Sequence, residues 1–308
     1  MRTKMIFLSL LIALAGFGSL QSSAQQDEDV RGAFLTTRPK TAPKTDKPGP
    51  NTQSSRRRPK ATTTNNAASA NGSTTNASTP RKASPPPLGL GLTLFMRDSN
   101  GLALRADPSR TFHKGDRVRV LLETNTDGYL YVFNTTNGGQ PVMIYPAAEL
   151  DEAGNYIQGH VPWEIPSSVA AEERLRWFTF DQSSGAEKLY FVFTREPLSA
   201  VPIEDDLITY CRDNNGKCPF KPAAGVWAQI KKELDAPVKI AKAERFGKSQ
   251  TAPETQAATR GIGLSRDDPE PSLIMLTAST SKNILVATLD LIHKSEIGTA
   301  AQNDQELE

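Results

Sequence analysis

Apolar and polar side chains alternate with a period of two over much of residues 88–294, a pattern that is typical of strands. In residues 117–122 every second side chain is apolar, which predicts a strand with one well-buried face. Residues 129–133 and 141–145 are largely apolar, and the turn sequence Asn137-Gly138-Gly139 lies between them. Because an Asn-Gly turn between two strand-like runs is a strong local signal, these residues predict a β-hairpin.

The same pattern predicts two further pairs of strands. Residues 175–180 and 189–193 flank the turn residues Ser183-Ser184-Gly185, so we expect them to pair with each other. Residues 272–278 and 284–292 are expected to form a last hairpin that closes the domain.

A strand is also predicted at residues 89–95, and short helices are predicted at residues 204–210 and 226–234. Residues 235–271 have no clear period and predict a long, weakly structured excursion. About eight strands joined by turns, with one or two short helices, are typical of a mainly β domain. We therefore expect an antiparallel β-sandwich or open barrel over residues 88–294.

The composition changes before this domain. Residues 36–87 contain no Leu, Ile, Val, Met, Phe, Tyr, Trp or Cys. No apolar burial can therefore offset the entropy of ordering the backbone, about 1–2 kcal/mol per residue. We expect residues 25–87 to form a disordered, basic linker. The densest basic cluster of this arm consists of Arg56, Arg57, Arg58 and Lys60.

Charge is distributed unevenly between the two parts. Ten basic side chains against Asp46 give residues 36–87 a net charge of +9, whereas residues 88–308 are acidic. Residues 295–308 are expected to be a disordered acidic tail. The basic arm suits an anionic envelope polymer or lipid headgroups, or it is a solvated spacer. The partner of the protein is expected to be such a polymer or another envelope protein. Nucleic acid is a poor candidate partner because the chain also carries an export signal.

The first 24 residues have the features of a secretory signal peptide. Arg2 and Lys4 precede an apolar run over residues 5–17, and Ser22-Ser23-Ala24 supplies the small residues that a signal peptidase requires. We expect cleavage after Ala24 and a periplasmic or extracellular protein. No later segment has the 18 or more uncharged apolar residues of a transmembrane helix, so no transmembrane segment is expected in the mature chain.

Cys211 and Cys218 are the only cysteines, and Asn214-Asn215-Gly216 between them is a turn sequence. In an exported chain this pair is expected to form a disulfide. A redox-active pair usually has only two intervening residues, and a zinc site needs more ligands, so both alternatives are disfavoured.

Five sequence segments together resemble the bacterial family called domain of unknown function 4384. They are residues 112–120, 125–134, 144–146, 165–167 and 187–197, which contain the motifs GDRVR, DGYLYVF, YP, IPS and FVFTREP, the last of them followed by Leu198. The resemblance covers about residues 110–198 and is expected to extend into the flanks. It implies a β-rich domain that occurs in exported proteins or beside signalling and protease-like modules. It implies no catalytic residues.

Few residues have a pattern that indicates chemistry. The three histidines, His113, His160 and His293, are far apart in the sequence and predict no metal site. Residues 123–128 begin like a calcium loop, but Asn134 stands where the bidentate glutamate should be, so at most a weak calcium-stabilised turn is expected. No nucleotide-binding or serine-hydrolase motif is present. No cofactor is expected.

Trp163 lies between Pro162 and Glu164 in a predicted loop, so we expect it to be exposed and to be a possible ligand contact. Trp177 is expected in the core. Together these observations favour an exported, non-enzymatic binding or structural module of the cell envelope. Two alternatives remain, namely an envelope-associated hydrolase with paired carboxylates and a sensory or regulatory module.

Overall fold

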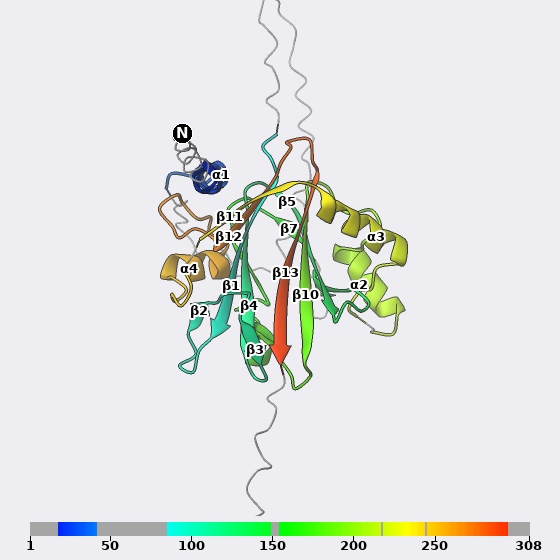
Figure 1. Ribbon diagram of the computed structural model, residues 1–308. Helices are drawn as coiled ribbons and strands as arrows, with labels where there is room; N and C mark the ends of the chain where they lie inside the picture. The colour runs from blue at the N-terminus through cyan, green and yellow to red at the C-terminus, as the bar shows by residue number, and fades with distance from the viewer. Residues whose placement is uncertain (1–17, 42–84, 149–153, 217, 244, 295–308) are drawn as a thin grey trace, which may run out of the picture.

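The computed structural model describes residues 18–41, 85–148, 154–216, 218–243 and 245–294. In this part of the chain the strands form two sheets that pack face to face (Figure 1). We call them sheet A and sheet B. In spatial order, sheet A contains β11 (Val238–Lys242), β12 (Leu273–Thr277), β1 (Gly89–Arg97), β4 (Arg117–Thr124) and β8 (Trp163–Ile165), with β2 (Ala103–Arg105) beside β1 and β9 (Phe178–Thr179) beside β4.

Sheet B has a similar size and completes the sandwich. Its strands, in spatial order, are β3 (Thr111–His113), β13 (Ile284–Lys294), β10 (Gly185–Thr194), β5 (Gly128–Thr136) and β6 (Val142–Tyr145), with β7 (Tyr156–Ile157) beside β5. Neighbouring strands are antiparallel in both sheets, except that β3 runs parallel to β13. The prediction of a mainly β, sandwich-like fold is confirmed.

One apolar core lies between the two sheets. Alternate side chains of a strand lie on the same face, so Leu90, Leu92 and Leu94 of β1 all enter this core. Their glycine neighbours Gly89 and Gly91 lie on the opposite, outer face of sheet A. Other core residues from the two sheets are Val118, Val120, Leu122, Leu130, Val132, Phe191, Phe193, Leu289 and Leu291.

Two helices cover the outer face of sheet B, α2 (Glu204–Asp213) and α3 (Ala224–Lys232), and α3 continues into a 3-10 turn at Glu233–Asp235 (Figure 1). Their contact with the sheet is apolar and aromatic. The ring of Trp227 lies 4.7 Å from that of Tyr190 and 5.6 Å from that of Phe133, measured between centroids. The structure thus confirms both helices that the sequence predicted.

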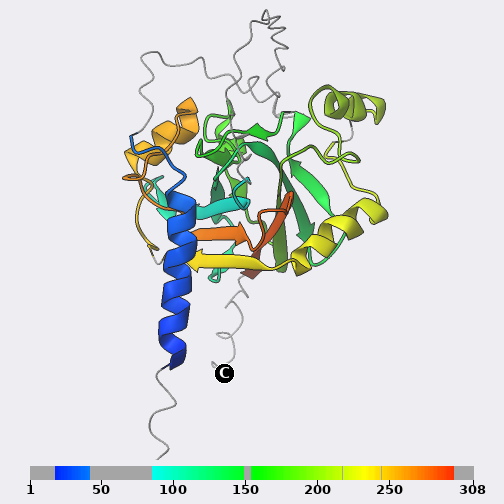
Figure 2. The ribbon, with the colours of Figure 1, turned by 90° about the horizontal axis from the view of Figure 1, so that it is seen from above.

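The outer face of sheet A is covered by two other elements, α1 (Gly18–Leu35) and α4 (Ala252–Arg260) (Figure 1). Figure 2 shows α1 crossing the strands of sheet A near β11 and β12. Val30 and Phe34 of α1 are buried there. The described chain therefore has four α-helices rather than the one or two that were expected.

Strand β4 is buried on both faces, although its sequence predicted one well-buried face. Its outward side chains include Arg119, Leu121 and Glu123, and each is buried. Covering segments supply the reason, since α4 packs on Leu121 and the N-terminal segment reaches Glu123. Polar residues on this face bind buried partners instead of water.

The hairpin predicted between residues 129 and 145 is confirmed, because β5 pairs antiparallel with β6 across Asn137-Gly138-Gly139. Two other predicted pairings are wrong. β9 pairs with β4 in sheet A, whereas β10, with which it was expected to pair, lies in sheet B. Residues 175 and 176, predicted as the start of that strand, belong instead to a 3-10 helix at Glu173–Arg176.

The predicted last hairpin is also wrong in its pairing. β12 pairs with β1 and β11 in sheet A, and β13 pairs with β10 in sheet B. The chain changes sheets between them. Alternation of apolar residues indicates which face of a strand is buried, but it does not specify the neighbouring strand, and both errors have this origin.

Residues 235–271 are more regular than predicted. They contain β11, which extends sheet A, and α4. The helix begins with a capping box, in which the Thr251 side chain accepts from the backbone N–H of Glu254 and the Glu254 side chain accepts from that of Thr251. It ends at Gly261, whose φ of 65° is the left-handed conformation that glycine readily adopts.

The prediction that residues 25–87 form a single disordered linker is wrong at its N-terminal end. Residues 25–35 belong to α1, and residues 36–41 continue along the folded body. Apolar anchors within residues 25–35 offset the entropy of ordering, which the composition of residues 36–87 alone did not suggest. Residues 42–84 lie outside the described residues.

Three other predictions concern residues at or beyond the limits of the described chain. The apolar run of the signal peptide and the acidic tail 295–308 lie outside the described residues, while α1 runs through the expected cleavage point after Ala24. Cleavage there would leave residues 25–35 of the helix on the mature chain. Among the described helices, none has the length and apolar character needed to cross a membrane.

Candidate functional site

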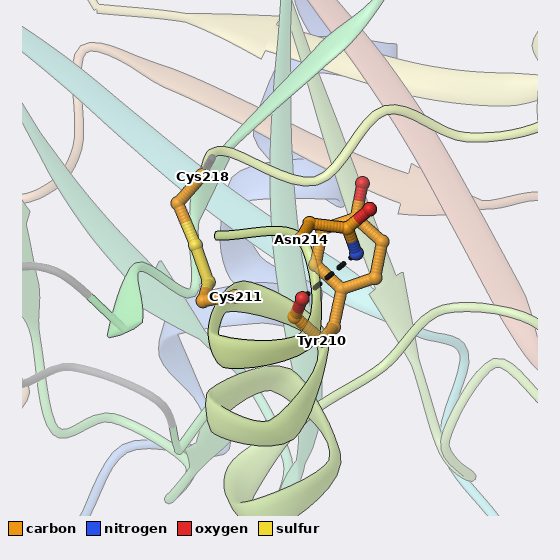
Figure 3. Close-up of a disulfide and its surroundings, with 4 residues drawn as sticks. All are labelled: Tyr210, Cys211, Asn214 and Cys218. Atoms are coloured by element: carbon orange, nitrogen blue, oxygen red, sulfur yellow. Dashed lines mark hydrogen bonds between the residues drawn. A yellow bond between two sulfur atoms is a disulfide. The ribbon is translucent and has the colours of Figure 1, made fainter. Parts of the chain in front are cut away.

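The predicted disulfide is present. Cys211 lies near the end of α2, and its sulfur is bonded to that of Cys218, with 5.3 Å between the Cα atoms (Figure 3). The side-chain amide of Asn214 donates to the carbonyl oxygen of Tyr210 at 2.8 Å and holds the helix end within this small loop. Such a bond is typical of proteins outside the reducing cytoplasm.

Trp163 is not the exposed ligand contact that was expected. It belongs to β8, pairs with Leu122 of β4, and is only 6% exposed. Its ring enters the core between the sheets, 6.1 Å from the ring of Tyr145. Glu164 is buried as well, so the polar sequence context gave a misleading indication of exposure.

The tryptophan that lines a surface pocket is Trp177, which was expected in the core. It borders a pocket of about 350 Å³ on the side of the molecule formed by sheet A. We call this the arginine–tryptophan pocket. Its charged and aromatic lining residues are Arg97, Arg119, Arg176, Glu173 and Trp177, and its neutral polar ones are Ser168, Ser249, Gln250 and Thr255.

Arg119 forms the rigid wall of this pocket. Its guanidinium lies 4.3 Å from the centroid of the Trp177 ring, within the range of a cation–π contact. Its Nε is 3.4 Å from Oε1 of Glu164, and Gln250 joins the two by accepting from Arg119 and donating to Glu164. Burial lowers the pKa of Arg119, and the charge of Glu164 opposes this effect.

The other two arginines are less constrained. Arg97 forms an ion pair with Glu173 at 3.0 Å. Arg176 donates to the carbonyl oxygen of Ala170 at 2.7 Å and has no carboxylate partner among the described residues. Three guanidinium groups against one lining carboxylate give the pocket a positive charge, and its hydroxyl and amide groups provide further hydrogen bonds. The arrangement suits an anionic ligand with hydroxyl groups or a ring.

A second pocket, of about 320 Å³, lies between the two sheets. We call it the inter-sheet pocket. Glu187 of β10 is its central polar group. It accepts hydrogen bonds from Asn134 at 2.7 Å and Thr136 at 2.9 Å, and its other oxygen is 3.9 Å from Nε2 of His293. The apolar lining residues are Val118, Ile144, Phe178, Phe180, Leu189 and Leu291.

His293 is 5% exposed, and its Nδ1 has no hydrogen-bond partner among the described residues. Asp181 also lines the inter-sheet pocket. A histidine and two carboxylates at one pocket can hold and transfer protons, although Asp181 already accepts from the backbone of Ser183 in a turn. The sequence did not indicate this grouping, because its members come from separate strands.

The predicted calcium-stabilised turn is not supported, because Glu123 has other partners. Its carboxylate binds Arg38 and His160 in a buried network. Asp127 accepts hydrogen bonds from the backbone of Gly159 and from the hydroxyl of Tyr156. In the described part of the chain, no three His, Cys, Asp or Glu side chains are grouped so that they could hold a metal ion.

The three histidines have different surroundings. His113 is exposed on β3, His160 belongs to the network of Glu123, and His293 borders the inter-sheet pocket. The basic cluster Arg56, Arg57, Arg58 and Lys60 lies outside the described residues.

Residues 111–197 match the family model described as domain of unknown function 4384, so the chain contains a DUF4384 domain at these residues. This segment runs from β3 to the end of β10. Strands outside it complete both sheets, since β1 pairs with β4 and β13 pairs with β10. No curated protein and no solved structure gives a significant match to the chain.

Proposed function

We propose that this chain, which contains a DUF4384 domain, is an exported, non-enzymatic binding module of the cell envelope. Its ligand on this proposal is an anionic saccharide polymer, bound at the arginine–tryptophan pocket. The observation that carries the proposal is that Arg97, Arg119 and Arg176 line one pocket of about 350 Å³ together with the partly exposed Trp177.

The chemistry of these groups supports this choice of ligand. Guanidinium groups bind carboxylate and phosphate oxygens through paired hydrogen bonds, and aromatic rings pack against the apolar faces of sugars. Arg119 is held in place by Glu164 and Gln250, so its position is preorganised. Arg176 has no carboxylate partner among the described residues, so it can meet an anion without first breaking an ion pair.

Two features support export. The N-terminal sequence has the pattern of a signal peptide, and the Cys211–Cys218 disulfide is of the kind that persists in oxidising compartments.

The experiment is a titration of the mature chain with polygalacturonate, an anionic polysaccharide, and with dextran, a neutral one. We expect saturable binding to polygalacturonate only, measured by calorimetry. Arg176→Gln should weaken it by about tenfold or more, because a hydrogen bond to a charged group contributes about 1.5–3 kcal/mol. Trp177→Ala should also weaken it.

Arg174 provides the matched control. It lies in the same 3-10 helix as Arg176, is exposed, and pairs with Glu172 away from the pocket lining. Arg174→Gln removes the same charge from the same helix, so it should leave the affinity within about twofold of the wild type, as expected for an exposed ion pair. Equal losses in the two variants would contradict a specific site.

The basic arm gives a separable, non-specific contribution. Replacing Arg56, Arg57, Arg58 and Lys60 by Gln should weaken retention on isolated envelope at low salt and have little effect at high salt. Retention that is independent of these four residues at every salt concentration would exclude a role for the arm in binding.

An envelope-associated hydrolase is the second candidate, and the grouping of Glu187, Asp181 and His293 at the inter-sheet pocket favours it. Turnover of peptidoglycan or polygalacturonate that disappears in Glu187→Gln would establish this alternative. Turnover absent from the wild type under the conditions in which it binds would support the non-enzymatic proposal.

A further inference from the structure

Residues 25–41 contact the folded body as a peptide ligand contacts a receptor. The side chains that are most deeply buried, Val30, Phe34 and Arg38, are spaced by four residues. This spacing places the first two on one face of α1, while Arg38 follows just beyond the end of the helix. The segment adds no strand to either sheet, and none of its residues belongs to the core between the sheets.

The apolar half of the contact is formed by the outer face of sheet A. Val30 and Phe34 pack with Ala241, Ile274 and Leu276 of β11 and β12.

Glycines of β1 leave room for the Phe34 ring. A Cβ atom at Gly89 would lie 2.9 Å from a ring carbon of Phe34, closer than such atoms normally approach. At Gly91 the corresponding distance is 3.3 Å, and a Cβ there would also collide with Pro271. A groove lined by backbone at these two positions is therefore required for the ring to reach the sheet.

The polar half is a socket for Arg38. Its side chain has no exposed surface, and each of its donor nitrogens is used. Nε and Nη2 donate to the two carboxylate oxygens of Glu123 at 2.8 and 2.6 Å. The remaining hydrogen bonds go to the carbonyl oxygens of Ser265, Asp268 and Pro269 at 2.9–3.1 Å.

His160 completes the socket and is held in position by the body. The Thr37 hydroxyl donates to the carbonyl oxygen of Phe34, and its oxygen lies 2.8 Å from Nε2 of His160. The other ring nitrogen donates to Glu123 at 2.7 Å. The backbone of His160 has a φ of 59° and is fixed by hydrogen bonds to Thr124 and Leu264, so its orientation does not depend on the segment.

We propose that the outer face of sheet A is a peptide-binding site for a helical segment that presents an apolar residue, an aromatic residue and an arginine at intervals of four. Residues 25–41 are its ligand. They fill it within one chain, and the same residues of a second copy fill it when the chain's own segment is displaced. This site is separate from the arginine–tryptophan pocket and does not rest on the proposed function.

The chain connection sets the competition between the two copies. Residues 42–84 connect the segment covalently to its own body, so docking within one chain is an intramolecular event with a high effective concentration. A second copy therefore binds measurably only when the resident segment is weakened or cut from the body.

The test uses a fluorescein-labelled synthetic peptide of residues 25–41 and the mature chain from Gln25. The receptor is the Phe34→Ala/Arg38→Ala variant of this mature chain. Its own segment lacks two of the side chains that bind the groove, while the residues of the groove are unchanged. Fluorescence anisotropy should show saturable binding to this variant. Binding to the wild type should be about a hundredfold weaker, because its own segment competes at high local concentration.

Peptide variants test the chemistry of the socket. An Arg38→Lys peptide should bind at least about tenfold more weakly, because an ammonium group cannot reproduce the planar set of donors. An Arg31→Ala peptide is the matched control, since Arg31 is partly exposed and pairs with Glu28 and Glu270 at the rim. It should bind within a fewfold of the unmodified peptide. A peptide that binds equally well with Arg38→Lys would overturn the proposal.

A second measurement tests the proposal without the Phe34→Ala/Arg38→Ala variant, in case that variant does not fold. A specific protease site is inserted after Lys60 in the otherwise unchanged chain and cut after folding. The released N-terminal fragment should co-elute with the body in gel filtration and exchange with excess labelled peptide. A fragment that separates at once, or one that never exchanges, contradicts a reversible peptide site.

Discussion

Arg38 and Glu123 should behave as a single unit in a double-mutant cycle. Arg38→Ala removes every hydrogen bond that the guanidinium donates in the socket, and Glu123→Gln replaces an accepting oxygen by an amide nitrogen that faces the guanidinium. Because the side chains are 0% and 3% exposed, either change leaves a buried charge without its ion-pair partner. Such a loss costs about 3–5 kcal/mol in a buried pair.

The size of the effect is limited by the docking free energy of the segment. Burial of Val30 and Phe34 contributes about 1.5–3 kcal/mol each. Ordering the backbone costs about 1–2 kcal/mol per residue, and an isolated helix of this length is marginal in water. Without the ion pair the segment therefore detaches, and the second substitution has nothing further to remove. The double variant should be no less stable than either single variant.

Hydrogen–deuterium exchange of residues 25–35 measures this effect locally. Protection there should fall by about two to three orders of magnitude in each variant and by the same amount in the double variant, whereas β4 and β10 keep most of theirs. Arg31→Ala is the control and should change protection by less than about fivefold. Additive losses, or wild-type protection in Arg38→Ala, would refute this account of how the segment is held.

Three further predictions concern acidity, the disulfide and the core. Burial raises the pKa of Glu123, but hydrogen bonds and charge from His160 and Arg38 outweigh it and hold this pKa below the ordinary value. The stabilisation is therefore present above about pH 4.3, the ordinary pKa of Glu, and it is lost as the pH falls through the lower pKa of the folded state. Hydrogen exchange of residues 25–35 should rise below about pH 4 in the wild type. Glu123→Gln should show no such step. Replacing Cys211 and Cys218 by Ser should lower the free energy of unfolding in urea by up to about 2.5 kcal/mol, the loop-closure value for about eight residues. Trp163→Ala should lower it by about 3–5 kcal/mol without a selective effect on polygalacturonate binding, as expected for a buried ring.

Local sequence signals predicted the parts of the fold that depend on neighbouring residues. The hairpin of β5 and β6 follows from two apolar runs and Asn137-Gly138-Gly139, and α2 and α3 follow from helical periodicity. Helix α4 also has a local signal, the capping box of Thr251 and Glu254, which the overall polarity of this region obscured.

Long-range relations were not accessible in the same way. β12 and β13 are close in sequence and both are rich in apolar residues, yet they join different sheets. The apolar pattern of a strand indicates which of its faces are buried, but it does not specify the neighbouring strand. The candidate pockets share this difficulty. Glu187 and His293 come from different strands, and Arg119 meets Gln250 only through the packing of residues 248–260 on sheet A.

The N-terminal segment shows how composition can mislead. Residues 36–87 contain so few apolar side chains that the whole of residues 25–87 was predicted to be disordered. This prediction overlooked Phe34, just before the polar stretch, which anchors the segment to sheet A. The spacing of Val30, Phe34 and Arg38 was visible, but only the structure reveals the acidic partner that makes a buried arginine stable. A basic residue in a polar sequence is usually exposed to solvent, and it becomes buried only where a distant part of the chain supplies a charged partner.

The two faces of the sandwich are covered by different kinds of contact, and this difference has a functional consequence. On sheet B, α2 and α3 pack through aromatic and aliphatic side chains. Opening this contact would expose apolar surface to water, which is unfavourable. On sheet A, two buried ion pairs, Arg38–Glu123 and Arg105–Glu254, join the sheet to the segments that cover it. Such an ion pair contributes little more net free energy than apolar packing would, but it requires one specific geometry. It therefore contributes more to the specificity of the contact than to its strength. Both the peptide site and the arginine–tryptophan pocket lie on this face, where arginines and carboxylates specify what binds. Recognition by this protein is therefore expected at sheet A, while sheet B fixes the scaffold.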